Sequence, residues 1–75
     1  MALDIGLLSY EKDGLITLSV NTSIYSYCID GAMLFKWLPM LCSKWSRRRM
    51  VAFLEIKKSC LWYKNETTGV IIDNA

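Results

Sequence analysis

Residues 5–20 read IGLLSYEKDGLITLSV, two largely apolar runs on either side of a polar stretch that ends in Gly14. Glycine takes positive φ angles without strain, as the loops of β-hairpins commonly require. We expect Tyr10 to pair with Leu15 around a four-residue loop. In that register Leu7 faces Leu18 and Ile5 faces Val20. The side chains that then share one apolar face are Ile5, Leu7, Ile16, Leu18 and Val20.

Residues 21–29 extend this hairpin by a third strand. Residues 21–23, Asn-Thr-Ser, favour a turn because their short polar side chains can hydrogen-bond to the nearby backbone. The following IYSYCI alternates, with Tyr25, Tyr27 and Ile29 on one side. The first thirty residues therefore predict a three-stranded antiparallel meander.

The pattern changes at Asp30, a residue type that commonly caps helix N-termini. Residues 31–45, GAMLFKWLPMLCSKW, are apolar at nearly every position, which is typical of a helix buried on most sides. Pro39 complicates this helix, since an interior proline removes one hydrogen bond and costs about 3 kcal/mol. Two outcomes are open: a helix from 31 to about 45 that is kinked at Pro39, or a short helix that ends by Leu38.

The last third is ambiguous by periodicity alone. As a strand, residues 50–57 place Met50, Ala52, Leu54 and Ile56 on one face; as a helix, the segment shares a stripe of Met50, Phe53, Leu54 and Leu61. We favour strands. CLWYK at 60–64 and VIID at 70–73 are rich in aromatic and β-branched residues, and a turn ending in Gly69 separates them.

The expected fold is therefore α+β: a small antiparallel sheet, made of an N-terminal meander and a C-terminal β-hairpin, around one central helix. Residues 1–75 are expected to form a single small domain, because a chain this short buries only one modest core. Such a core rarely contributes more than about 3–5 kcal/mol, so small domains usually need a disulfide, a metal or a partner.

The cysteines indicate that this chain relies on a partner. Cys28, Cys42 and Cys60 are odd in number and widely spaced, and no histidine accompanies them to complete a zinc site. We interpret them as buried thiols in a reducing, cytoplasmic location. The N-terminus does not resemble a signal peptide, and the uncharged residues 14–29 are too few and too polar to span a bilayer. We therefore expect no membrane association.

The residue content also argues against catalysis. With no histidine, a cysteine nucleophile lacks its usual base, and the seven acidic residues are scattered. None of the glycine patterns that cradle phosphates is present. We expect a protein that is not an enzyme, with no cofactor and no small-molecule substrate.

Charge is segregated along the chain. Residues 36–64 carry eight basic residues and one acidic residue, a net charge of +7, whereas residues 1–35 carry −3 and residues 65–75 carry −2. Such polarity governs the choice of partner more than the overall charge of +2 does.

The basic middle segment supplies the candidate partner-binding residues. Arginine offers a planar fork that matches carboxylates or phosphates, and a nearby tryptophan can insert into a partner's pocket. The competing interpretation is that the arginines are solvated and Trp45 belongs to the core. The candidates are Lys44, Trp45, Arg47, Arg48, Arg49, Lys57 and Lys58.

Two functions follow from this surface. The first is a non-enzymatic interaction protein that binds a protein partner, or itself as a homodimer. Compact viral or phage accessory inhibitors of host machinery are expected to look this way. The alternative is a nucleic-acid-binding protein that uses residues 44–58 on phosphates. The acidic ends argue against the alternative, because dedicated nucleic-acid binders usually carry a larger positive charge.

Overall fold

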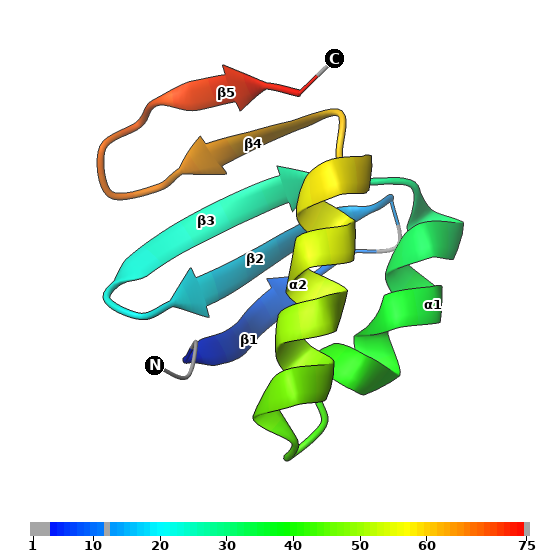
Figure 1. The fold of residues 1–75 in the computed structure, drawn as a ribbon. Coiled ribbons are helices and arrows are strands. Elements are labelled where there is room, and N and C mark those ends of the chain that lie inside the picture. The colour runs from blue at the N-terminus through cyan, green and yellow to red at the C-terminus, as the bar shows by residue number, and fades with distance from the viewer. Residues whose placement is uncertain (1–3, 12, 75) are drawn as a thin grey trace.

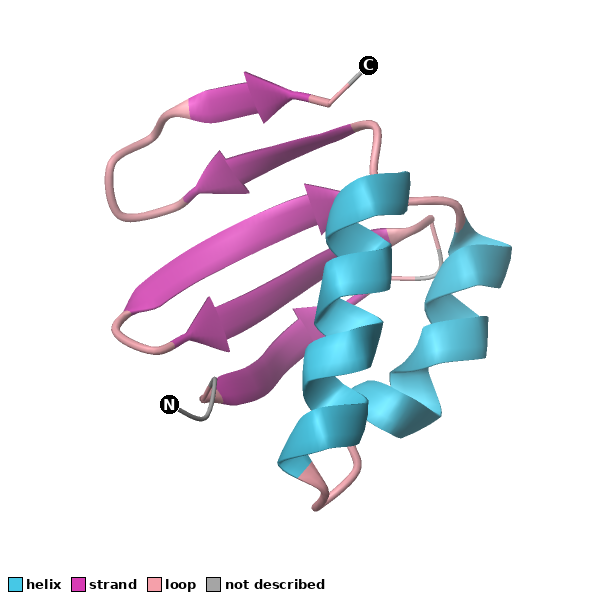
Figure 2. Cartoon of the chain, viewed as in Figure 1, coloured by secondary structure: helices cyan, strands magenta, loops and turns pink. Residues whose placement is uncertain are grey.

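The computed structural model describes residues 4–11 and 13–74. Five strands form one antiparallel sheet whose spatial order follows the chain order, and two helices pack side by side on one face of it (Figures 1 and 2). The α+β class is therefore confirmed, but there are two helices rather than one. The elements are β1 (Ile5–Tyr10), β2 (Leu15–Val20), β3 (Ser23–Cys28), α1 (Gly31–Leu41), α2 (Ser46–Ser59), β4 (Trp62–Asn65) and β5 (Ile71–Asp73).

The predicted meander is confirmed, with one irregularity. Ile5 pairs with Val20 and Leu7 pairs with Leu18, as the sequence indicates. A bulge between Leu7 and Ser9 then shifts the register, so that Tyr10 pairs with Ile16 rather than with Leu15. The extra residue of a bulge does not oppose a partner of its own, and an alternation pattern does not reveal where it is inserted.

Both turns of the meander use left-handed backbone conformations. Gly14 has φ 94°, as its place in the loop predicted, and Asn21 has φ 56°. Asparagine is one of the few side chains that tolerate this region. The Asn21 N–H also donates to the Asp4 carbonyl at 2.7 Å, which extends the hydrogen bonding between β1 and β2 beyond the Ile5–Val20 pair.

The core lies between the sheet and the helices. The strands contribute the predicted apolar face, apart from Leu7, which is only half-buried. Tyr27 lies at the centre, edge-on to Phe53 of α2 at 5.8 Å and stacked on Tyr63 of β4 at 5.6 Å. Burial, followed by the neighbouring Tyr25, raises the pKa of the Tyr27 hydroxyl. The buried core side chains are Ile5, Ile16, Leu18, Val20, Tyr27, Ile29, Leu34, Leu41, Ala52, Phe53, Ile56 and Cys60.

Helix α1 begins as predicted and ends between the two predicted limits. The Asp30 carboxylate accepts a hydrogen bond from the Ala32 N–H at 2.8 Å, which is N-capping. The helix continues through Pro39 to Leu41, whereas the sequence left open an end by Leu38 or near residue 45. A kink at Pro39 remains a prediction.

The largest correction concerns residues 46–59, which form helix α2 and not strands. The buried residues are Ala52, Phe53, Ile56 and Cys60, a spacing of one, three and four that fits a helical period of 3.6. Arginine, lysine, alanine, leucine, methionine and glutamate, all good helix formers, dominate the segment. The helix propensity of these residues favours a helix, but the alternation of apolar and polar residues in the sequence favoured a strand.

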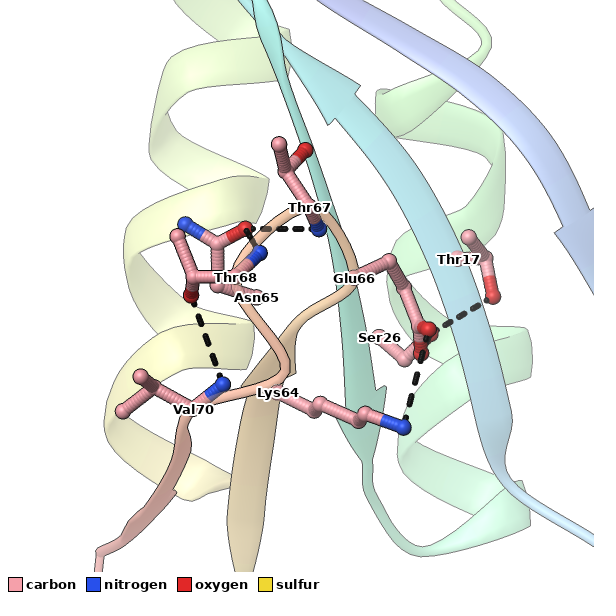
Figure 3. Close-up of polar contacts among 8 residues, drawn as sticks. All are labelled: Thr17, Ser26, Lys64, Asn65, Glu66, Thr67, Thr68 and Val70. Atoms are coloured by element: carbon pink, nitrogen blue, oxygen red, sulfur yellow. Dashed lines mark hydrogen bonds and ion pairs between the residues drawn. The ribbon is translucent and has the colours of Figure 1, made fainter.

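The C-terminal hairpin is confirmed, and it is tied to α2. The Asn65 side-chain oxygen accepts from the N–H groups of Thr67 and Thr68, at 2.9 and 3.3 Å (Figure 3). Gly69 completes the turn with φ 77°. After β5, the Asn74 side-chain amide donates to the carbonyl of Lys57 at 2.7 Å, so it satisfies an end group of α2 that the helix itself leaves open.

Candidate functional site

Trp45 is the most exposed large apolar side chain of the described residues, at 73%. It lies at the N-cap position of α2 with an extended backbone, φ −86° and ψ 112°. An indole cannot accept a hydrogen bond from the first helical N–H groups, so Trp45 leaves the helix end without a side-chain cap. Because most of its surface is exposed, the Trp45 ring is open to contact with a partner.

Three arginines occupy the first turn of α2, and no acidic residue accompanies them there. The N-terminus of a helix carries a partial positive charge from its aligned peptide dipoles and its free N–H groups. Cations at this position are therefore unfavourable within the chain. The three arginines and the helix dipole together concentrate positive charge at this end of α2, and an anionic group bound there would neutralise it.

Successive helical residues point about 100° apart, so the three arginines do not point the same way. Arg47 and Arg48 are exposed. Arg49 shares the inner side of the helix with Phe53 and Ile56 and is half-buried. Its Nε atom is buried and has no hydrogen-bond partner among the described residues. Arg49 therefore lies on a different side of α2 from Arg47 and Arg48, and its part in partner binding stays a prediction.

Lys57 and Lys58 lie in the last turn of α2, about 12 Å along the helix axis from Arg49. Cations stabilise this end of a helix, where the dipole is negative. The Lys57 ammonium also lies 5.8 Å from the centre of the Tyr63 ring. The predicted residues therefore form two groups at opposite ends of α2. Lys44, Trp45, Arg47 and Arg48 are one group, and the two lysines are the other.

An apolar strip joins the two groups along the outer side of α2. Met50, Val51 and Leu54 are exposed, and Arg47, Val51, Leu54 and Lys58 follow each other at intervals of four, three and four. That spacing places them on one face of a helix. The sequence did not reveal this strip, because a strand would place Leu54 and Ile56 on the same face. In the structure Ile56 is buried and Leu54 is exposed.

The sheet face away from the helices carries a polar network (Figure 3). Ser26 donates to a Glu66 carboxylate oxygen at 2.8 Å and lies 3.1 Å from the Thr17 hydroxyl. Lys64 is 3.8 Å from the other Glu66 oxygen. Because Ser26 is only 5% exposed and bonded on both sides, this network holds β2, β3 and β4 in register and does not present a nucleophile.

The three cysteines are free thiols in three different environments. Cys60 is buried, Cys28 is half-buried and Cys42 is exposed. The prediction that all are buried is therefore wrong for Cys42, which follows the last residue of α1 and lies outside the core. Burial raises the pKa of the Cys60 thiol.

Thiol reactivity should follow this order. We expect Cys42 to react first with an aromatic disulfide reagent at neutral pH, and Cys60 only as the protein opens, since the thiolate is the reactive form. Following absorbance against time measures the phases. The Cys42→Ser variant should lack the fast phase. A fast phase that survives this substitution would contradict the burial order.

No family model, curated protein or solved structure matches the chain. Over residues 4–11 and 13–74, no group of three or more Cys, Asp or Glu side chains is arranged to hold a metal ion. Within the same residues neither helix is long and apolar enough to cross a membrane.

Proposed function

We propose that the protein is a non-enzymatic interaction protein that binds an acidic protein partner through the outer side of α2. The surface consists of Lys44, Trp45, Arg47 and Arg48 at one end and the Met50, Val51 and Leu54 strip beside them. The exposure of Trp45 is the observation that carries this proposal. An exposed tryptophan next to arginines has the composition of an interface hot spot.

The open N-terminus of α2 supports an anionic partner. A carboxylate supplied by the partner could accept from the first N–H groups of the helix and oppose the charge of Arg47 and Arg48 at once. Burial of the Trp45 ring would add the apolar part of the binding energy. The positive charge of residues 36–64 would accelerate the encounter.

The apolar strip favours a protein over a nucleic acid. Protein–DNA interfaces are more polar and more positive than protein–protein interfaces, and phosphate binding needs a track of cations. On α2 the cations are interrupted by Met50, Val51 and Leu54, and Arg49 is turned inward. Nucleic-acid binding through residues 44–58 therefore remains the alternative against which the proposal is tested.

The decisive variant is Trp45→Asp, combined with selection of peptide ligands from a random display library. Aspartate is a preferred N-cap, so we expect this substitution to stabilise the protein by about 1 kcal/mol while it removes the indole and adds a repelling charge. Selected peptides should be acidic with an apolar anchor. They should bind the variant at least about thirty-fold more weakly, as measured by fluorescence anisotropy.

Phe35→Ala is the matched control, because Phe35 is an exposed aromatic residue on α1, outside the proposed surface. It should leave peptide affinity unchanged. Labelled single- and double-stranded DNA form the competing arm. Binding that falls steeply between about 50 and about 200 mM salt and is lost when Arg47, Arg48 and Arg49 are replaced by Ala would favour the nucleic-acid alternative.

A further inference from the structure

Among the described residues, the last strand of the sheet has a neighbouring strand on one side only. β5 is the outermost strand and pairs only with β4 among the described residues. The Val70 carbonyl accepts from Asn65 and the Asn74 N–H donates to Leu61, so both point toward β4. Because these directions alternate along an antiparallel strand, the N–H and carbonyl of Ile71 point away from β4, into the open edge.

Apolar side chains occupy both faces of the sheet at this edge. Val70, Ile71 and Ile72 are all exposed, and Ile71 is 62% exposed. Proteins usually protect an open edge with charges, proline or a bulge. The opposite edge, β1, has such a bulge at Leu8, whereas the register of β4 with β5 runs without one and β5 carries a single charge, at Asp73.

Two hollows border the same edge, one on each face of the sheet. On the helix side, a groove of about 490 Å³ is lined by Val70 and Ile72 together with Tyr63 and Lys57. On the other side, a hollow of about 430 Å³ is lined by Leu61, Trp62, Ile71 and Asp73. A strand laid against β5 would direct alternate side chains to the two hollows.

We infer that the strand at this edge is β5 of a second copy, joined antiparallel about a two-fold axis at Ile71. In this register Ile71 opposes Ile71 of the second copy, and Val70 opposes its Ile72, so every facing pair in the strand centre is apolar. Each Asp73 then opposes Gly69 of the other copy and no like charges face each other. Centring the pair on Ile72 would instead place Asp73 opposite Ile71.

This dimer joins two sheets into one and leaves the α2 surface free. Figure 1 places β5 at one end of the molecule and the connection between α1 and α2 at the other. Two copies of the Trp45 surface would therefore be displayed together, which raises avidity for a partner with repeated sites. The inference does not depend on the proposed function, since it concerns different residues.

Introducing a charge at Ile71 tests the register directly. Ile71→Lys and Ile71→Glu each place two like charges opposite one another across the axis, so each variant alone should be monomeric. An equimolar mixture should associate again, because opposite charges then face each other. Sedimentation equilibrium of the full chain measures all three samples, and wild type should be dimeric at high concentration. We expect each single variant to raise the dissociation constant at least about tenfold.

Leu8→Lys is the matched control, since Leu8 is 54% exposed on the opposite edge strand. It should dimerise like wild type. Amide hydrogen exchange gives a second measurement without any substitution: protection of the Ile71 N–H should rise with protein concentration, while that of Ile72, which faces β4, should not. A monomeric wild type, dimers that survive both charges at Ile71, or a mixture that fails to associate would each overturn the inference.

Discussion

Gly14→Ala is expected to leave most of the protein unfolded. Gly14 has φ 94°, which costs a residue with a Cβ about 1–2 kcal/mol. A Cβ there would also overlap the carbonyl oxygen of Ile29, a backbone atom that cannot rotate away. The Ile29 N–H donates to the Gly14 carbonyl at 2.8 Å, so relief of the overlap would break the contact that joins the first turn to the end of the meander.

These costs together match the whole stability of about 3–5 kcal/mol expected for a core of this size. Urea titration followed by circular dichroism measures the loss. Gly69→Ala is the matched control, because Gly69 also has a positive φ, 77°, but nothing lies within 4 Å of the position a Cβ would take. It should cost only the 1–2 kcal/mol of backbone strain, about what left-handed geometry demands. Equal costs at the two positions would show that the approach of Ile29 is not tight.

Gly14 also shows how much of the fold the sequence can predict. A glycine at the end of a polar loop between two apolar runs implied a turn, and the pattern of Ile5, Leu7, Leu18 and Val20 fixed the register. The bulge at Leu8 was not predictable, because an inserted residue changes pairing without changing composition. The close approach of Ile29 was equally invisible, since it depends on where the third strand ends.

The sequence predicted which residues make up the candidate surface, but it did not predict which of their side chains face outward. Residues 44–49 show that a tryptophan and several cations lie together, but which of them face outward depends on the helix of which they form the first turn. With a strand in place of α2, Arg49 and Arg47 would share a face. The helical period instead separates them, turning Arg49 toward Phe53 and leaving Arg47 with Leu54.

Substitution of two neighbouring apolar residues distinguishes these two structures in solution. Ile56 is fully buried, and Ile56→Ala should cost about 2–5 kcal/mol, enough to unfold much of so small a protein. Leu54 is 44% exposed on the outer side of α2, and Leu54→Ala should cost under about 1 kcal/mol, because alanine is a good helix former.

A strand would place both residues on one face, so both substitutions would then cost similar amounts. In the helix the difference between them must be large. If Ile56→Ala is too unstable for a full titration, Ile56→Val should still lower the free energy of unfolding by about 0.5–1.5 kcal/mol. Chemical denaturation of the three variants and of wild type measures the loss in free energy of unfolding at each position. Comparable losses at residues 54 and 56 would contradict helix α2 and, with it, the outward strip on which the proposed partner surface depends.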